Sequence, residues 1–468
     1  MTVYRKIKGY LSRILSHFPI IKRFLGATMF YIRTKNRKQV IMSAETTADY
    51  VRATRSTGNL PSLFYDVSAL YLTNEARGIH RVVINILKKL LTNYKEEFNI
   101  VLVRSSNKGI YTCNVDNYDD TKFRFTSNDD LVKVKPGDIF ISLDLYKKFN
   151  FIALHELQKK GLKVYFIVYD ILDLRDSHLG ENDIITKMIV RSARNSYNNW
   201  LHSVISIADG VICDSETVLN ELAEWVNKNI SKNYKNICLG HFHLGADFDC
   251  LNKENQPMLI SFGDSTMLIE AMKKPSFLMV GVMDPHKCHL QSIRAFEELW
   301  SDSIDVSLII VGKEGMLQPH LGTMIQAHEE YGRRLFWFSY VSDEDLVFLY
   351  KNCSALLAAS FSEGFCLPLI EAAHHNLPII ARDIPIFREV AGNYAYFFKN
   401  NNATDLAEAV VSWLSMASES KIPESRGMPY LNWEASTHRL FDIVINDRWT
   451  VCYPVEDGFL LKSKKEIS

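Results

Sequence analysis

Two carboxylates, Glu363 and Glu371, flank a stretch of the chain that could bind an anion. The apolar run 354–360 is typical of a buried strand, and Gly364 breaks it with backbone angles that other residues avoid. Pro368 stands where the first turn of a helix tolerates proline best. A strand that leads through a glycine loop into a helix leaves the first helical N–H groups unpaired, and the helix dipole adds positive charge there. The loop is therefore a candidate phosphate site.

The two carboxylates are unsuitable phosphate ligands, so they suggest contact with another part of a ligand. Carboxylate oxygens accept hydrogen bonds from hydroxyl groups, such as those of a sugar and a ribose on either side of a diphosphate. Acidic residues are also common near helix N-termini, where they interact favourably with the dipole. Both interpretations are compatible with the spacing of Glu363 and Glu371.

The charge of the chain is balanced overall but unevenly distributed. The 468 residues include 54 Lys and Arg and 54 Asp and Glu. Residues 1–44 nevertheless contain basic residues and no acidic ones, so the remaining chain is net acidic. We expect no nucleic-acid partner, because such a partner requires a basic face on the main body of the protein. The length is sufficient for two domains.

The distribution of cysteines and apolar residues indicates the cellular compartment of the protein. The chain has 8 cysteines, which are scattered and form no C-x-x-C pair. This pattern favours a reducing compartment and argues against structural zinc. No apolar run is long enough to cross a membrane, and no secretory signal is evident. We therefore expect a cytoplasmic protein.

The N-terminal segment, residues 1–45, is predicted to be a basic amphipathic helix. Its apolar residues recur at spacings of three and four among the basic ones. Such a helix can lie in the plane of an anionic membrane. The alternative is a solvated helix that packs on its own domain or on an acidic partner. We expect residues 1–40 to attach the protein peripherally to the inner face of the cell membrane.

A first α/β domain is predicted over residues 62–250. A buried strand begins at Leu63, and a loop with Gly78 leads into an apolar-periodic helix. A later strand, near Val164–Tyr169, ends at Asp170. Ligands of open parallel sheets bind at the carboxyl ends of strands, so Asp170 is a candidate to contact a ligand. The alternative is a carboxylate that caps the next segment.

A second α/β domain is predicted over residues 275–445, followed by a C-terminal tail at 446–468. Its first strand ends shortly before Lys287, and a helix follows. An ammonium group at the carboxyl end of that strand can neutralise a diphosphate and stabilise it as it leaves. The alternative for Lys287 is a solvated lysine in a turn.

The segment from Glu363 to Glu371, E-G-F-C-L-P-L-I-E, resembles the E-x7-E motif of the retaining GT-B glycosyltransferases of family 4. The similarity continues through L-P-I-I-A-R-D at 377–383 and F-R-E-V-A-G at 387–392. More closely, the chain resembles the bacterial mannosyl- and rhamnosyltransferases that build O-antigen and capsule polysaccharides.

The resemblance implies a GT-B fold, in which two doubly wound, Rossmann-like α/β domains face each other across a cleft. It implies that the nucleotide-sugar lies mainly on the second domain and the acceptor on the first. By resemblance, Glu363 contacts the sugar near its anomeric carbon, Glu371 binds the ribose hydroxyls and Lys287 holds the diphosphate. The catalytic residues are then Glu363, Lys287 and Asp170. The other donor-binding residues are Gly78, His286, Val341, Gly364, Phe365, Cys366 and Leu367.

The chain departs from the family pattern at positions that matter for charge. Most relatives of this subgroup have an arginine at the position of His286, and others have one at the position of Val282. One fixed positive charge is therefore missing, unless bound phosphate protonates His286 or Lys313 substitutes. Many relatives have a His-Asp pair near the acceptor hydroxyl, where this chain has Tyr169 and Asp170. No histidine role carries over, and Asp170 remains, by resemblance, a candidate to orient or deprotonate the acceptor.

We therefore expect a retaining glycosyltransferase that moves a sugar, with mannose or rhamnose favoured, from a nucleotide-diphosphate sugar to a growing, lipid-linked surface polysaccharide. We expect no cofactor and no metal, because cationic side chains can stabilise the leaving phosphate. Two alternatives remain. One is a nucleotide-sugar epimerase of GT-B fold, which needs no acceptor. The other is an inactive GT-B subunit that scaffolds a polysaccharide assembly complex.

Overall fold

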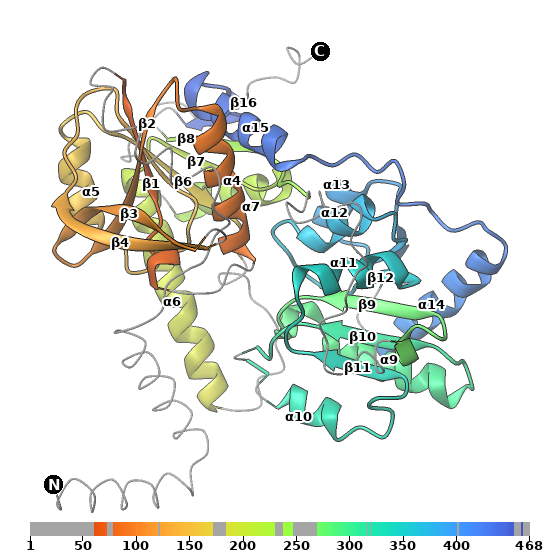
Figure 1. The fold of residues 1–468 in the computed structure, drawn as a ribbon. Helices are drawn as coiled ribbons and strands as arrows, with labels where there is room; N and C mark the ends of the chain where they lie inside the picture. Colours follow the sequence, from red (N-terminus) through yellow and green to blue (C-terminus); the bar gives the residue numbers. More distant parts are fainter. Residues whose placement is uncertain are drawn as a thin grey trace, which may run out of the picture. The chain divides into compact units, whose positions relative to one another are not determined.

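A computed structural model gives the fold of the chain (Figure 1). It describes residues 60–72, 78–119, 122–171, 184–229, 237–246, 269–315, 317–318, 320–399, 402–453 and 460–461. The predicted basic helix of residues 1–40 lies outside these ranges. The chain divides into two compact units, Met1–Val134 with Asp144–Leu154, and Lys135–Leu143 with His155–Ser468. The predicted domain limits remain a prediction.

The first unit contains four described strands in the order β1-β2-β3-β4. These are β1 (Ser62–Asp66), β2 (Asn99–Ser106), β3 (Gly109–Asp119) and β4 (Lys122–Leu131). The predicted strand and helix are confirmed as β1 and α4 (Ile79–Asn93), which connects β1 to its parallel neighbour β2. The antiparallel strands β3 and β4 were not predicted, because their many polar residues hide the alternating pattern.

The second unit begins with parallel strands in the order β8-β7-β6-β5. They are β5 (Ile139–Ser142), β6 (Lys163–Val168), β7 (Gly210–Cys213) and β8 (Ile237–His241), with helices α6 (Ile184–Ile207) and α7 (Glu216–Asn229) between them. Strand β15 (Val451–Tyr453) pairs antiparallel with β8, and a disulfide joins Cys238 to Cys452. Neither the strand nor the disulfide was predicted.

A separate six-stranded parallel sheet follows in the second unit, in the order β11-β10-β9-β12-β13-β14. Its strands are β9 (Ser276–Val280), β10 (Ser307–Val311), β11 (Leu335–Phe338), β12 (Ala355–Ala358), β13 (Ile379–Arg382) and β14 (Tyr396–Phe398). The helices are α9 (His289–Ser301), α10 (Leu321–Gln326), α11 (Asp343–Asn352), α12 (Leu367–His374), α13 (Pro385–Ala391) and α14 (Ala403–Ser418). The chain runs outward from β9 in one direction and from β12 in the other, so these two strands form the switch point at which such sheets bind ligands.

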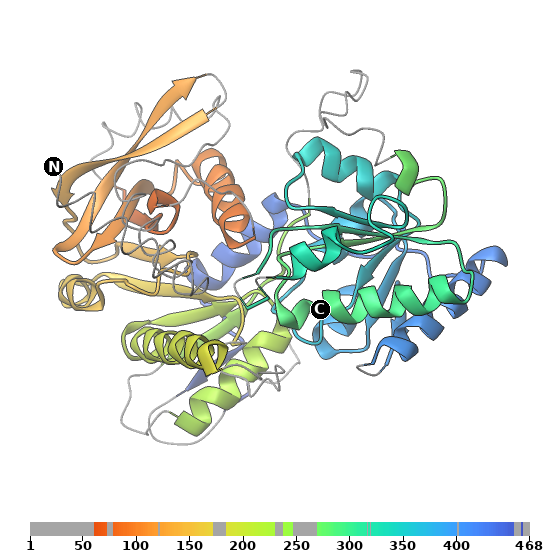
Figure 2. The same ribbon diagram turned by 90° about the horizontal axis from the view of Figure 1, so that it is seen from below.

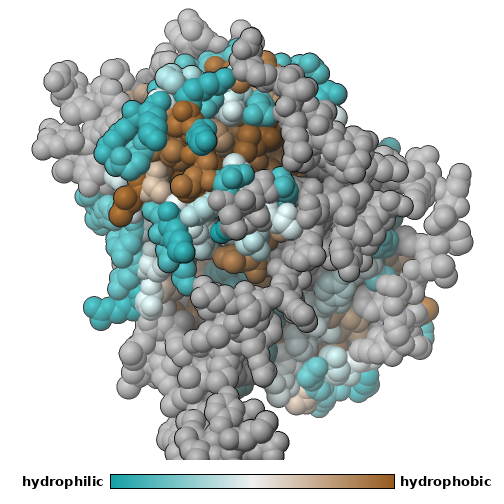
Figure 3. All heavy atoms as spheres, turned by 60° about the vertical axis from the view of Figure 1, so that its left-hand side comes forward, coloured by the Kyte–Doolittle hydropathy of each residue, from teal (hydrophilic) through white to brown (hydrophobic). Residues whose placement is uncertain are grey.

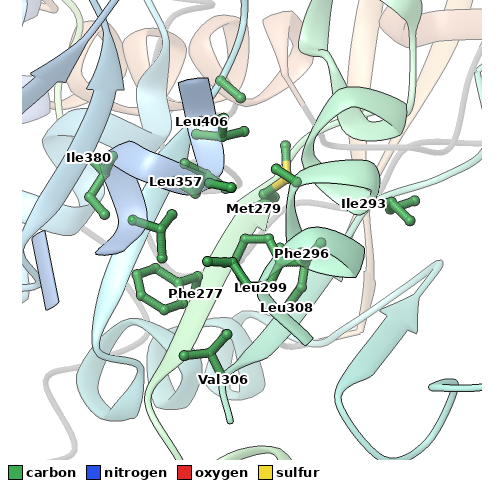
Figure 4. Close-up of a cluster of buried hydrophobic side chains, with 14 of the residues drawn as sticks. Phe277, Met279, Ile293, Phe296, Leu299, Val306, Leu308, Leu357, Ile380 and Leu406 are labelled. Atoms are coloured by element: carbon green, nitrogen blue, oxygen red, sulfur yellow. The ribbon is translucent and has the colours of Figure 1, made fainter. Parts of the chain in front are cut away.

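The strands of this sheet are apolar along their length because helices cover them. Helices α9 and α14 lie side by side (Figure 2). Beneath α9, Phe277 of β9 packs edge-on against Phe296, with ring centroids 5.5 Å apart (Figure 4). Strands of a parallel sheet that is covered by helices are apolar at successive positions, as in the fully buried run of β10. The packed core therefore holds the carboxyl ends of β9 and β12 in place.

The last helix of the chain contacts the segment that follows β8. Helix α15 (Trp433–Ile445) follows α14 in the chain, and the hydroxyl of its Ser436 donates to the His243 carbonyl oxygen at 2.7 Å. Figure 3, which brings forward the side with α5 (Phe151–Gln158) and β4, shows hydrophobic residues within a hydrophilic rim. Ile152 and Leu131 are exposed apolar residues of these elements. Within the described ranges, no helix has the length and apolar character that crossing a membrane requires.

Candidate functional site

A pocket lies at the carboxyl ends of β9 and β12, at the switch point of the six-stranded sheet. Its polar and loop residues are Lys287, His289, Ser360, Glu363, Cys366 and Pro368. Lys287 precedes α9, and Cys366 is the N-cap of α12, so two helix N-termini border the pocket. The unpaired N–H groups and dipoles of these helices favour a negatively charged ligand.

Glu363 and Lys287 form an ion pair in this pocket. The Lys287 Nζ atom lies 2.5 Å from Glu363 Oε1, and the side chains are 20% and 8% exposed, respectively. Burial acts to raise the pKa of Glu363, but Lys287 and His286 outweigh it and lower that pKa below its usual value. Burial acts to lower the pKa of Lys287, but Glu363 raises it overall. At neutral pH the pocket therefore contains a carboxylate and an ammonium group in direct contact.

The backbone holds this pair in place from both sides. Lys287 ends the 3₁₀ turn Pro285–Lys287, and its side chain lies over Gly281, where an added Cβ would be 3.5 Å from Lys287 Cε. The carbonyl oxygen of His286 accepts a hydrogen bond from the Phe361 N–H at 2.9 Å. This bond joins the turn after β9 to the loop after β12. His286 therefore helps to position the pair through its main chain.

The role of Gly364 differs from the predicted one. Gly364 has no left-handed backbone; Cys366 has one instead, with φ 73° and ψ 75°. At Gly364 an added Cβ would lie 1.8 Å from the carbonyl oxygen of Tyr169 and 3.3 Å from Asp170 Cβ. The prediction of special backbone angles at Gly364 was therefore wrong. Glycine is required there because the loop passes against the segment that follows β6.

This close approach brings Asp170 next to the glycine loop. Tyr197 of α6 donates a hydrogen bond to the Asp170 carbonyl oxygen, which fixes the main chain at that point. Asp214, which follows β7, is buried. Burial, and after it the charge of Asp170, raises the pKa of Asp214 well above its usual value. Asp170 and Asp214 are therefore electrostatic neighbours beside the glycine loop.

Ser215 connects the same loop to a helix N-terminus. Its hydroxyl donates to the Gly364 carbonyl oxygen at 2.8 Å and accepts from the Val218 N–H at 3.1 Å. The second bond is the N-cap of α7. One side chain thus satisfies a helix end and holds the loop that carries Glu363.

Glu389 of α13 provides a second capping group for α7. Its carboxylate accepts hydrogen bonds from the Glu216 and Thr217 N–H groups, each at 2.8 Å. Its Oε1 atom also lies 2.7 Å from His243 Nε2. The His243 ring in turn packs edge-on against Phe365, with centroids 5.4 Å apart. Phe365 is therefore held by packing, and its buried ring is directed at His243.

Replacing Glu389 by glutamine should lower the free energy of unfolding at pH 7 by about 2 kcal/mol, after allowance for partial solvent exposure. Burial acts to raise the pKa of Glu389, but the hydrogen bonds from His243 and Thr217 outweigh it and lower the pKa to about 2. A lowered pKa contributes stability above the unfolded-state value, and that stability is lost as the pH falls toward the folded-state value. Urea unfolding at pH 7, 5 and 3 should therefore show the wild type and variant converging.

The matched control for this prediction is Glu419→Gln, because Glu419 pairs with Lys421 in an exposed position. That variant should differ little from the wild type at any of the three pH values. A gap between wild type and Glu389→Gln that stays constant with pH would contradict the stabilising role of the Glu389 charge.

The remaining predicted residues lie in different surroundings. Glu371 is buried in α12, where its Oε2 atom accepts a hydrogen bond from the Tyr350 hydroxyl at 2.6 Å. Leu367 is the first residue of α12. Val341 is buried after β11, which is two strands away from β9. Gly78, with φ 55° and ψ −124°, caps α4 in the first unit. The structure thus gathers Glu363, Lys287 and Cys366 in the pocket, and His286, Gly364, Phe365 and Asp170 around it.

Four residues near the site were not predicted: Asp214, His243, His289 and Glu389. The segment containing Glu389, F-R-E-V-A-G, was part of the family resemblance, but nothing in it shows that the carboxylate caps another helix. His289 follows the first strand of its sheet and opens a helix, which was the available signal for a pocket residue. Across the described residues, no group of three or more His, Cys, Asp or Glu side chains could hold a metal ion.

Sequence comparisons point to sugar-transferring proteins. Residues 267–427 match the family model described as glycosyl transferases group 1. The chain is 33% identical over 386 residues to the serotype-specific mannosyltransferase WbdA of Escherichia coli, covering 81% of this chain and 46% of that protein. It is 30% identical over 150 residues to the O-antigen chain mannosyltransferase RfbU of Salmonella typhimurium, covering 32% and 41%. The chain thus spans about half the length of the curated relatives it matches.

Solved structures show the same fold. A sucrose-phosphate synthase from Thermosynechococcus elongatus aligns with a TM-score of 0.54 at 14% identity, over 82% of this chain and 98% of that one. A UDP-forming trehalose-phosphate synthase from Burkholderia xenovorans aligns with a TM-score of 0.55 at 12% identity, over 83% and 99%. Identities this low show the fold alone. The predicted α/β fold of GT-B type is confirmed.

Proposed function

We propose that this chain is a glycosyltransferase that moves a sugar from a nucleotide-diphosphate sugar to a surface polysaccharide of O-antigen type. The observation that carries the proposal is the partly buried Glu363–Lys287 pair in a pocket at the switch point of the sheet. Mannose is favoured as the transferred sugar, because curated relatives are named mannosyltransferases. Rhamnose is the second candidate for the transferred sugar. We also propose that transfer retains the anomeric configuration, as in family 4, and that the acceptor is lipid-linked.

Lys287 and the helix N-termini suit the leaving group of this reaction. Negative charge grows on the diphosphate as its bond to the sugar breaks. The Lys287 ammonium group and the first N–H groups of α12 then stabilise that charge more in the transition state than in the ground state. These groups supply positive charge from the protein itself, so we propose transfer without a metal or other cofactor. Lys287 is already ionised by its contact with Glu363.

Glu363 suits the sugar side of the same bond. Positive charge develops at the anomeric carbon in transition states of glycosyl transfer, which resemble an oxocarbenium ion. The contact with Lys287 keeps the Glu363 carboxylate ionised despite its burial. A fixed negative charge beside the anomeric carbon stabilises that developing charge. We propose that Glu371 binds the ribose hydroxyls of the donor and that the backbone N–H groups of the pocket bind its diphosphate.

Asp170 is proposed to orient or deprotonate the acceptor hydroxyl, since it lies against the Gly364 loop next to Glu363. The raised pKa of Asp214 disfavours a second negative charge beside Asp170. We further propose that residues 1–40 hold the protein at an anionic membrane, where a lipid-linked acceptor is available.

Thermal unfolding with GDP, UDP, dTDP or CDP, each with and without EDTA, tests this function first. A ligand at about one hundred times its dissociation constant should add about 2.7 kcal/mol to the free energy of unfolding. We expect one base to stabilise the protein and EDTA to leave that effect unchanged. The sugar nucleotides of the stabilising base then serve as donors in a transfer assay, and NMR of the product gives its anomeric configuration.

Other results would point to the alternatives. No stabilisation by any nucleotide would favour the inactive scaffold. Release of an epimerised sugar nucleotide without an acceptor would favour the epimerase. Loss of stabilisation in EDTA would remove the metal-independent part of the proposal.

A further inference from the structure

His289 is a buried histidine of the pocket whose presence the ion pair does not explain. It is the first residue of α9, lines the pocket with Lys287 and Glu363, and is only 2% exposed. Burial lowers its pKa to about 3, and the neighbouring Lys287 and His286 contribute to the decrease. The imidazole is therefore neutral at physiological pH, with one N–H donor and one acceptor nitrogen.

No described residue forms a hydrogen bond with the Nδ1 atom of His289. A buried polar atom without a partner costs about 1–3 kcal/mol, and nearly all such atoms in folded proteins are satisfied by protein, water or ligand. The first position of a helix does not require histidine, and an apolar side chain would fill this wall without that cost. The pocket itself is thus the place to look for the missing partner.

The surroundings of His289 select the class of that partner. Lys287 places a positive charge beside the ring, and the N-terminus of α9 adds the positive end of a helix dipole. A neutral N–H donor in such a place complements an anionic oxygen. The Lys287 ammonium group attracts an anion without fixing its orientation, whereas a hydrogen bond from the imidazole is directional.

We propose that the imidazole of His289 hydrogen-bonds an oxygen of the donor's diphosphate and orients it beside Lys287. The inference rests on the proposed function, because it assigns this role within the same donor site. The bond is assigned to the ring and not to one nitrogen, since a half-turn about the Cβ–Cγ bond exchanges Nδ1 with Cδ2. His289 is then a binding residue that determines how the leaving group is held.

The test compares the wild type with His289→Leu, which keeps an apolar wall but removes the hydrogen bond. Calorimetry measures binding of the nucleoside diphosphate that stabilises the wild type, and ligand-observed NMR measures the matching nucleoside. Loss of one hydrogen bond to a charged group should weaken diphosphate binding about tenfold or more. Nucleoside binding should stay unchanged. His438→Leu, at an exposed position in α15, serves as the control and should bind both as the wild type does.

Equal diphosphate affinity in wild type and His289→Leu would overturn the inference, as would an equal loss for nucleoside and diphosphate. Absence of diphosphate binding by the wild type would instead remove the proposed function, and the inference with it. If the leucine variant does not fold, ¹⁵N-histidine NMR of the wild type decides. The His289 ring signal, assigned by its absence in His289→Asn, should move with the diphosphate and not with the nucleoside. If the signal does not shift when the diphosphate is added, the proposed contact is refuted.

Discussion

Replacing Glu363 by glutamine should lower the rate of sugar transfer by about a hundredfold to a thousandfold. Glutamine keeps the shape of the side chain but removes the negative charge proposed to face the anomeric carbon. It also leaves Lys287, whose side chain is 20% exposed, without its partner. Breaking a fully buried pair destabilises a protein by about 3–5 kcal/mol, which is the upper limit for this one. Activity and stability should therefore both fall in the single variant.

The double variant Glu363→Gln/Lys287→Met separates the two effects. Replacing both members of a buried ion pair by uncharged residues is often neutral for stability, so most of the lost free energy of unfolding should return. Transfer should stay as low as in the single variant or fall further, because the charge on the leaving phosphate loses Lys287 as well. The measurements are urea unfolding and initial transfer rates at a temperature where every variant is folded.

Glu330→Gln is the control, since Glu330 also forms a partly buried ion pair, with Arg334 at 2.6 Å, but does not line the pocket. It should reduce stability and leave the transfer rate close to that of the wild type. Near-normal transfer by Glu363→Gln would remove Glu363 from the mechanism. Recovery of transfer along with stability in the double variant would show that Glu363 acts only through folding.

Gly364→Ala should lower both the free energy of unfolding and the transfer rate. The added Cβ would lie 1.8 Å from the Tyr169 carbonyl oxygen, which is main chain and cannot rotate away. Either the loop or the segment after β6 must move, and overpacking of this kind costs about 1–3 kcal/mol. Any movement of the loop displaces Glu363, and a displacement of about 1 Å near a reacting centre can reduce the rate about a hundredfold.

Gly137→Ala is the matched control, because Gly137 has a left-handed φ of 93° but no atom within 4 Å of an added Cβ. It should cost only the backbone strain, about 1–2 kcal/mol, with the transfer rate kept. Urea unfolding and initial rates of both variants provide the comparison. A Gly364→Ala variant as stable and active as the wild type would show that the loop does not need the close approach to Tyr169.

Local sequence patterns predicted the elements that carry the site. The apolar run before Gly364 and the proline after it predicted a strand and a helix, which are β12 and α12. Helix α11 likewise has a local cap, because the Ser342 hydroxyl accepts a hydrogen bond from the Asp345 N–H at 3.1 Å. These features depend on residues a few positions apart, so hydrophobic period and capping preference are sufficient to read them.

Patterns with weak local signals were missed for a physical reason. Strands β3 and β4 contain many polar residues, so the sequence shows no clear alternation of apolar and polar positions. They are recognised as strands by their pairing with each other. Cys238 and Cys452 are 214 residues apart and become bonded because β15 pairs with β8. Strand pairing of this kind depends on contacts between distant segments, which spacing along the chain does not encode.

Short-range patterns along the chain thus predicted the α/β character, the strand–loop–helix units and the residue types that could hold a sugar nucleotide. Which of these residues meet depends on how distant segments pack together. Lys287 and Glu363 are 76 residues apart and touch because β9 and β12 are neighbours at the switch point. Gly364 needs to be glycine because of Tyr169, a residue of a distant segment, and not because of its own backbone angles. Local structure follows from short-range preferences, whereas a site depends on which strand ends the packed core brings together.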